Sequence, residues 1–131
     1  MLEDLLAELR MIGLPFRIDP QRLIIEATDY IPNNMGNDLT DIGIQEIIIQ
    51  LDGISDYSKL KGTRFDGLLT FELRNAPLEV ILPKCEVKRL YLHLRGNCKR
   101  IDVSKVCLLE ELIIAIYQDS AESILQLRIG K

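Results

Sequence analysis

The sequence predicts an α/β solenoid of about four to five coils, with a parallel β-sheet and an N-terminal capping helix. Three observations carry this prediction. The chain has 131 residues, the size of one domain. Its apolar residues are mostly aliphatic, with 22 Leu and 18 Ile, whereas aromatic residues make up only 5%. A short apolar pattern also recurs along residues 42–131, at intervals that suit one coil of a solenoid.

The first residues predict a short amphipathic helix. Its apolar positions at helical spacing are Leu2, Leu5, Leu6 and Leu9. Gly13 and Pro15 follow, a typical C-terminal stop, because glycine takes the left-handed conformation and proline cannot continue a helix. Residues 16–26 are β-like, and residues 30–41, dense in turn formers, are expected to be a surface loop rather than a cation site. We therefore expect a single domain over 1–131, with 1–41 as a cap and 42–131 as the solenoid.

The pattern apolar-x-x-apolar-x-apolar occurs four times. Its positions are Ile44, Ile47, Ile49; Leu68, Phe71, Leu73; Val87, Leu90, Leu92; and Leu109, Leu112, Ile114. The starting points are 24, 19 and 22 residues apart, too long for a hairpin repeat and too short for two packed helices. Each coil should contain one strand, a turn, and a second extended segment or brief helical turn. A last alternating strand at Leu125, Leu127 and Ile129 would form the C-terminal edge.

Part of this repeat resembles a known family. Residues 101–112, IDVSKVCLLEEL, resemble the L-D-V-S-K-x-x-x-L-x-x-L segment of a bacterial form of leucine-rich repeat, and Leu90-Tyr91-Leu92 continues the likeness upstream. The resemblance covers residues 87–114. It implies a leucine-rich-repeat-like solenoid whose concave β-face binds another protein without catalysis. The family's asparagine ladder is not maintained, since Asn97 lies one place off register, which predicts an irregular solenoid.

Composition excludes several classes of function. The 16 Lys and Arg against 20 Asp and Glu give a net charge of -4, and no basic run is present, so nucleic acid is not an expected partner. The N-terminus is acidic where an export signal would be basic, and no apolar stretch is long enough to cross a membrane. Three cysteines without a C-x-x-C pair favour a reducing, cytoplasmic location. No sequence motif indicates a metal or a cofactor.

Strand alternation predicts a partner-protein site on the outer face of the sheet. If Leu90, Leu92 and Leu94 point into the core, the residues between them point outward. Tyr and Arg are enriched at protein interfaces because each combines a large contact area with a polar end. The expected partner-binding residues are Arg89, Tyr91, His93, Arg95, Ile113 and Tyr117. The alternative, that these positions only supply β-forming and solubilising side chains, stays open.

The function we expect is a non-catalytic interaction module, used as an inhibitor or immunity-type protein by analogy with the fold. Two alternatives remain. The first is an enzyme of unrecognised type centred on His93, the only histidine, with Glu72, Glu111 or Cys98 as a neighbour. The second is a self-assembling module, such as a homodimer, that pairs through the C-terminal edge strand.

Overall fold

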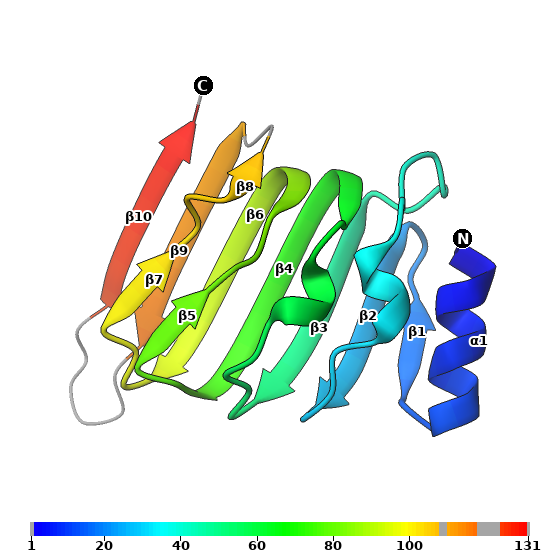
Figure 1. The fold of residues 1–131 in the computed structure, drawn as a ribbon, viewed down its shortest axis with the longest axis horizontal. Helices are drawn as coiled ribbons and strands as arrows, with labels where there is room; N and C mark the ends of the chain where they lie inside the picture. Colours follow the sequence, from blue (N-terminus) through cyan, green and yellow to red (C-terminus); the bar gives the residue numbers. More distant parts are fainter. Residues whose placement is uncertain (1, 108–109, 118–123, 131) are drawn as a thin grey trace.

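The computed structural model describes residues 2–107, 110–117 and, as backbone, 124–130. These residues form a small β-solenoid of about four turns, with a parallel sheet and one N-terminal helix (Figure 1). The long parallel strands lie side by side in chain order. They are β2 (Arg22–Thr28), β3 (Glu46–Asp52), β4 (Arg64–Ala76), β6 (Cys85–Gly96) and β9 (Glu111–Tyr117).

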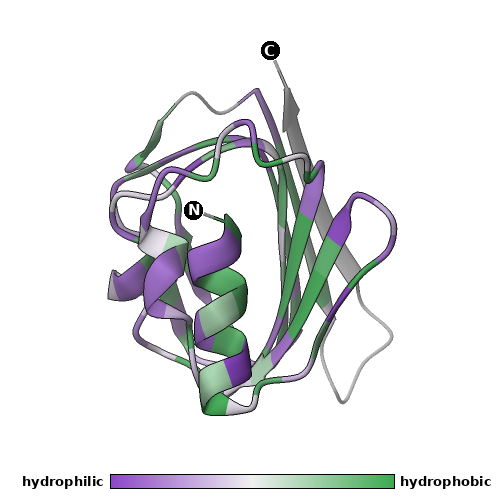
Figure 2. Ribbon diagram, turned by 90° about the vertical axis from the view of Figure 1, so that its right-hand side faces the viewer, coloured by the Kyte–Doolittle hydropathy of each residue, from purple (hydrophilic) through white to green (hydrophobic). Residues whose placement is uncertain are grey.

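The opposite side of each turn is built from short elements, as expected. They are the 3-10 helices η1 (Asn33–Gly36) and η2 (Ser58–Leu60) and the strands β5 (Glu79–Ile81) and β7 (Arg100–Asp102), which pair with each other. Strand β8 (Val106–Cys107) pairs in parallel with the start of β6 and therefore belongs to the large sheet. Seen along the stack, the sheet forms one wall and these short elements form the other, with the core between them (Figure 2).

Both ends of the sheet depart from the parallel arrangement. Strand β1 (Phe16–Ile18) runs antiparallel to β2, and β10 (Ile124–Gly130) runs antiparallel to β9. We had not predicted either antiparallel pair. The connections between β1 and β2 and between β9 and β10 are shorter than the dozen or more residues that a parallel crossover needs, so antiparallel pairing follows from their length. Helix α1 (Leu2–Ile12) lies beyond β1 (Figure 1). No helix of the described residues is long and apolar enough to span a membrane.

Equivalent residues stack in register along the sheet. One such row is Arg22, Glu46, Leu68, Arg89 and Glu111, whose numbers differ by 24, 22, 21 and 22. Phe71 pairs with Ile49 and Leu92. The repeat alignment in the sequence instead matched Phe71 with Ile47 and Leu90, so its second unit was wrong by two residues. A slip of two keeps every side chain on the same face, and hydropathy alone therefore does not detect it.

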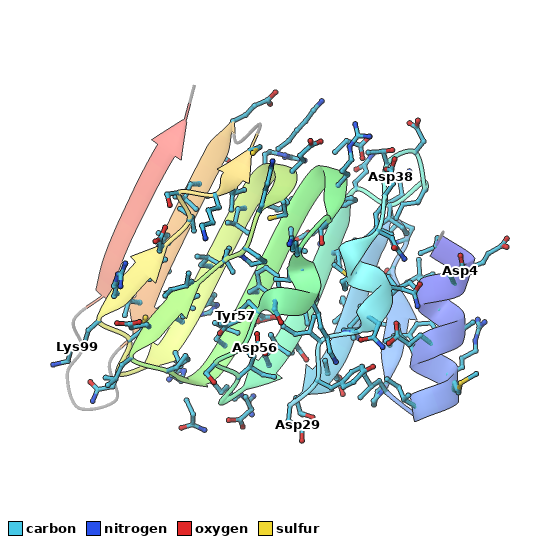
Figure 3. All side chains as sticks on the ribbon, in the orientation of Figure 1. Asp4, Asp29, Asp38, Asp56, Tyr57 and Lys99 are labelled. Atoms are coloured by element: carbon cyan, nitrogen blue, oxygen red, sulfur yellow. The ribbon has the colours of Figure 1, made fainter. Side chains whose placement is uncertain are left out.

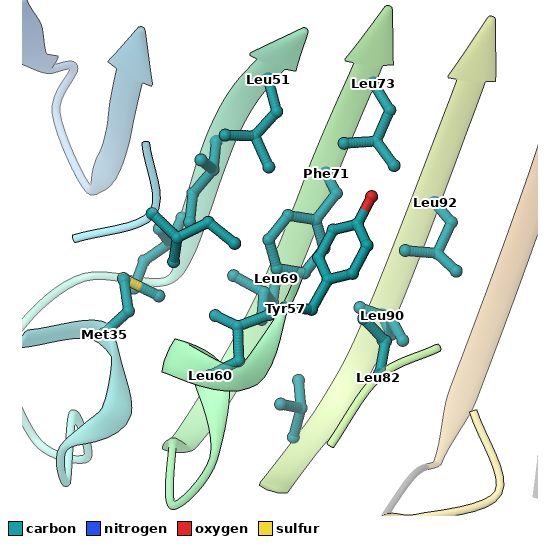
Figure 4. Packing of buried hydrophobic residues seen from close by; sticks show 14 of the residues in the cluster. Met35, Leu51, Tyr57, Leu60, Leu69, Phe71, Leu73, Leu82, Leu90 and Leu92 are labelled. Carbon is teal, nitrogen blue, oxygen red and sulfur yellow. The ribbon is translucent and has the colours of Figure 1, made fainter. Parts of the chain in front are cut away.

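The core lies between the two walls. The inner face of the sheet contributes Leu23, Ile25, Ile47, Ile49, Leu69, Phe71, Leu90, Leu92, Leu112 and Ile114. Tyr57, just before η2, lies beside Phe71 of β4, on the side that faces Leu92 of β6 (Figures 3 and 4). Its ring is buried, and its hydroxyl donates a hydrogen bond to the carbonyl of Ile54 at 2.9 Å. The polar end of this core tyrosine is thus satisfied.

Residues 30–41 are more than the surface loop we expected. Ile31, Met35 and Leu39 are buried from this segment and close the first turn of the solenoid. Thr63, fully buried, donates its hydroxyl hydrogen to the Met35 carbonyl and ties the segment to the next turn. These apolar positions lie four residues apart, a helical spacing, but the turn formers Pro32, Asn33, Asn34 and Gly36 between them concealed it.

Candidate functional site

The outer face of the sheet carries the residues that alternate with the core. On β6, Leu90, Leu92 and Leu94 are buried inward, whereas Tyr91 and His93 are half-buried and face outward with the exposed Arg95. On β9, the half-buried Ile113 lies opposite Tyr91, and Tyr117 lies opposite Arg95. The exposed Arg89 begins this outward series on β6, opposite Glu111. The six residues expected to bind a partner therefore lie on two neighbouring strands.

Four of these residues form one cluster. The rings of Tyr91 and His93 are stacked, with centroids 6.0 Å apart. The ring of Tyr117 lies 4.6 Å from that of His93, and the Arg95 guanidinium carbon lies 5.6 Å from the centre of the Tyr117 ring. Burial, followed by the nearby Tyr117 and Glu72, raises the pKa of Tyr91. Tyr91 therefore stays a neutral hydrogen-bond donor at physiological pH. We call Tyr91, His93, Arg95 and Tyr117 the aromatic cluster.

Beside this cluster the outer face is hollowed. A hollow of about 450 Å³ lies over the carboxyl-terminal halves of β2, β3, β4 and β6. Its charged lining residues are Glu26, Asp52, Glu72, Arg74 and Arg95, and His93 lines it as well. The uncharged Thr28 and Gln50 complete its polar lining. His93 and Arg95 thus belong both to the aromatic cluster and to the hollow.

The hollow extends the site to strands that the sequence did not single out. Glu26, Thr28 and Asp52 were not among the expected binding residues, yet they face the same hollow as His93. The alternation of side chains along residues 22–28 would have placed Glu26 and Thr28 on the face of the sheet away from the core. Their proximity to β6 depends on the register across four strands, which the sequence pattern did not provide.

Hydrogen bonds order the polar rows of this face. The side-chain amide of Gln50 donates to Glu72 at 3.2 Å, one strand away. Asn75 donates to Asp52 at 2.8 Å. In the row before the hollow, Glu46 accepts a hydrogen bond from Thr70 at 3.0 Å and pairs with Arg22 at 3.3 Å.

The surroundings of His93 bear on the catalytic alternative. Glu72 lies opposite His93 in the ladder, whereas Glu111 lies opposite Arg89, at the start of the outward row. Cys98 is buried, and its thiol donates to the Arg100 carbonyl at 3.4 Å. Of the three expected neighbours, Glu72 alone lies opposite His93 and lines the hollow with it. In the described residues, no group of three or more His, Cys, Asp or Glu is placed to hold a metal.

Comparison with known proteins gives no relative. No family model, curated protein or solved structure matches the chain.

Proposed function

We propose that this protein binds a partner protein through the outer face of its parallel sheet and acts without catalysing a reaction. The observation that carries the proposal is the aromatic cluster, in which two tyrosines, a histidine and an arginine converge at the surface. Tyr and Arg side chains dominate the energetics of many interfaces because they bury large areas while keeping a polar end. The other expected contacts, Arg89 and Ile113, flank this cluster on the same face.

We assign the solenoid to the leucine-rich-repeat type, with four coils followed by the hairpin of β9 and β10. Coils of 21 to 24 residues along the parallel sheet support this assignment. The use we propose is inhibition or neutralisation of the partner, by analogy with other small binding proteins of solenoid fold. A cytoplasmic location follows from the cysteine pattern of the sequence.

The geometry favours binding over the enzyme alternative. The imidazole of His93 lies near the rings of Tyr91 and Tyr117, and in the part of the chain that the structure describes no hydrogen bond joins it to Glu72, the carboxylate opposite it in the ladder. Self-pairing through β10 is the other alternative, since β10 is the last strand of the described sheet. Sedimentation velocity over a range of concentrations tests it: a dimer would support self-pairing, and a monomer throughout would exclude it.

The test of the proposal is a pull-down from a lysate of the source organism with the tagged protein and the variant Tyr91→Ala/Tyr117→Ala. The matched control is Leu78→Ala/Ile81→Ala, which removes two exposed apolar side chains on and beside β5, away from the sheet face. We expect one partner that is retained by the control variant and lost by the tyrosine variant. Equal recovery with both variants would overturn the proposal.

A further inference from the structure

The charges of the hollow are sorted by strand. Glu26 on β2 and Asp52 on β3 make one side acidic. Arg95 on β6 makes the other side basic, and the imidazole of His93 lies on the same strand. Strand β4, which lies between them, carries one charge of each sign, the acid Glu72 and the base Arg74. The sign of the charge therefore changes across β4.

These charges do not neutralise one another within the protein. Asp52 and Arg74 occupy paired positions in the ladder, yet no ion pair joins them in the part of the chain that the structure describes. Asp52 and Glu72 instead accept hydrogen bonds from the neutral amides of Asn75 and Gln50. The guanidinium of Arg95 lies over the Tyr117 ring. Both sides of the hollow thus keep their charge for a ligand.

We propose that the hollow binds an extended segment of the partner protein in which a Lys or Arg and an Asp or Glu lie four residues apart. This inference rests on the proposed function and specifies the partner's chemistry. The basic residue lies against Glu26 and Asp52, and the acidic residue against His93 and Arg95. A volume of about 450 Å³ accommodates a few side chains of such a segment.

The spacing follows from sheet geometry. Neighbouring strands lie about 4.8 Å apart, so the three steps from β2 to β6 cover about 14 Å. An extended chain that crosses the strands advances about 13 Å over four residues, and residues four apart point to the same side. A segment with a single charge would satisfy one side of the hollow and leave the other side without a counter-charge.

The test is an NMR titration of the isotope-labelled protein with the capped peptide Lys-Ala-Ala-Ala-Asp. Two control peptides replace either Lys or Asp with Ala. We expect the amide signals of the residues that line the hollow to shift. The doubly charged peptide should bind about threefold to fivefold more tightly than either control peptide, because it forms one more solvent-exposed ion pair. Equal affinities for the three peptides, or shifts confined to another face, would overturn the inference.

Variants connect this result to individual charges. Glu26→Gln should weaken binding of the doubly charged peptide toward that of the control peptide without Lys, although Asp52 remains on the acidic side. Arg95→Gln should weaken it toward that of the control peptide without Asp. Glu79→Gln, an exposed acid on β5 outside the hollow, should change nothing. If the pull-down partner depends on Tyr91 and Tyr117 but is bound equally by Glu26→Gln and Arg95→Gln, this inference fails while the proposed function stands. A partner insensitive to all of these changes would overturn both.

Discussion

The rings of His93 and Tyr117 lie 4.6 Å apart across the strands β6 and β9, although the two residues do not pair in the ladder. The residue opposite His93 is Ala115, and the residue opposite Tyr117 is Arg95. Ala115 has no side chain beyond its Cβ, so it leaves room for the Tyr117 ring to reach the imidazole diagonally. The contact therefore depends on a small residue between two large ones.

We expect the aromatic cluster to contribute moderately to folding. Each of the two aromatic pairs is worth about 1 kcal/mol beyond its buried area, and the two half-buried rings also lose apolar contact, so Tyr91→Ala/Tyr117→Ala should lower the free energy of unfolding by about 3 kcal/mol. Urea unfolding followed by far-UV circular dichroism measures this difference. A loss above about 4 kcal/mol, or a transition that is no longer cooperative, would instead assign the cluster a structural role.

Glu8 should make the attachment of helix α1 pH-dependent. Its carboxylate accepts hydrogen bonds from the Tyr30 hydroxyl, the Asn33 and Asn34 backbone N–H groups and the Asn34 side chain, at 2.8 to 2.9 Å. Burial raises the pKa of Glu8, but these hydrogen bonds together lower it below its ordinary value of 4.5. Because the folded-state pKa is depressed, the stabilisation is complete above pH 4.5 and is lost as the pH falls through the folded-state pKa.

The variant Glu8→Gln measures this effect. At neutral pH it should lower the free energy of unfolding by about 1 kcal/mol, after allowance for the partial exposure of the carboxylate. The difference from the unmodified protein should shrink as the pH falls below 4.5. Urea unfolding at neutral and acidic pH measures it, and a difference that stays constant with pH would contradict the account.

Gly67 should tolerate no side chain. A Cβ at this position would lie 2.3 Å from the carbonyl oxygen of Gln45 and 2.8 Å from the Phe65 ring. The same carbonyl accepts the Leu68 N–H at 2.9 Å, so it cannot move without loss of that hydrogen bond. Gly67→Ala should cost about 3 kcal/mol.

Gly53→Ala is the matched control for this substitution. Gly53 has φ +70° and open space around its Cα, so the cost there is that of the left-handed conformation, about 1 kcal/mol. Thermal unfolding of both variants compares the two effects. A Gly67 variant as stable as the Gly53 variant would argue against the close approach of β3 and β4.

The three cysteines should differ in reactivity. Burial, with a smaller effect of Cys107, raises the pKa of Cys85 to about 11, and burial also raises that of Cys98. The half-buried Cys107 should therefore react first with iodoacetamide at about pH 8, because the thiolate is the nucleophile. Peptide mass spectrometry after timed alkylation gives the order. Equal rates at Cys85 and Cys107 in the folded protein would contradict the burial of Cys85.

The sequence predicted the elements that have a regular period. The leucines of α1 and the alternating strands β3, β4, β6 and β9 were recognisable because burial on one face imposes a spacing on apolar residues. The coil over residues 30–41 was not, because the turn formers around Met35 argue against a helix although the buried Ile31, Met35 and Leu39 lie four residues apart. The antiparallel direction of β10 depends on the length of its link to β9, which hydropathy does not report.

For the candidate site, the sequence predicted which residues of one strand share a face, but not which residues of neighbouring strands lie beside them. Alternation placed Tyr91 and His93 on one face, and the structure brings them to Tyr117. The hollow joins side chains from four strands, so its prediction requires the register of each neighbouring pair. The two-residue error at β4 was enough to misplace Glu72 and Arg74 relative to His93.

The most direct test of the central claim is site-specific photocrosslinking in a lysate of the source organism. A photoreactive phenylalanine analogue replaces Tyr91 on the outer face of β6 or, in the control protein, the exposed Leu78 beside β5. We expect a discrete protein adduct from position 91 that position 78 does not form, and that the unlabelled protein competes away. Adducts that are the same at both positions, or that form only at position 78, would contradict binding through the outer sheet face.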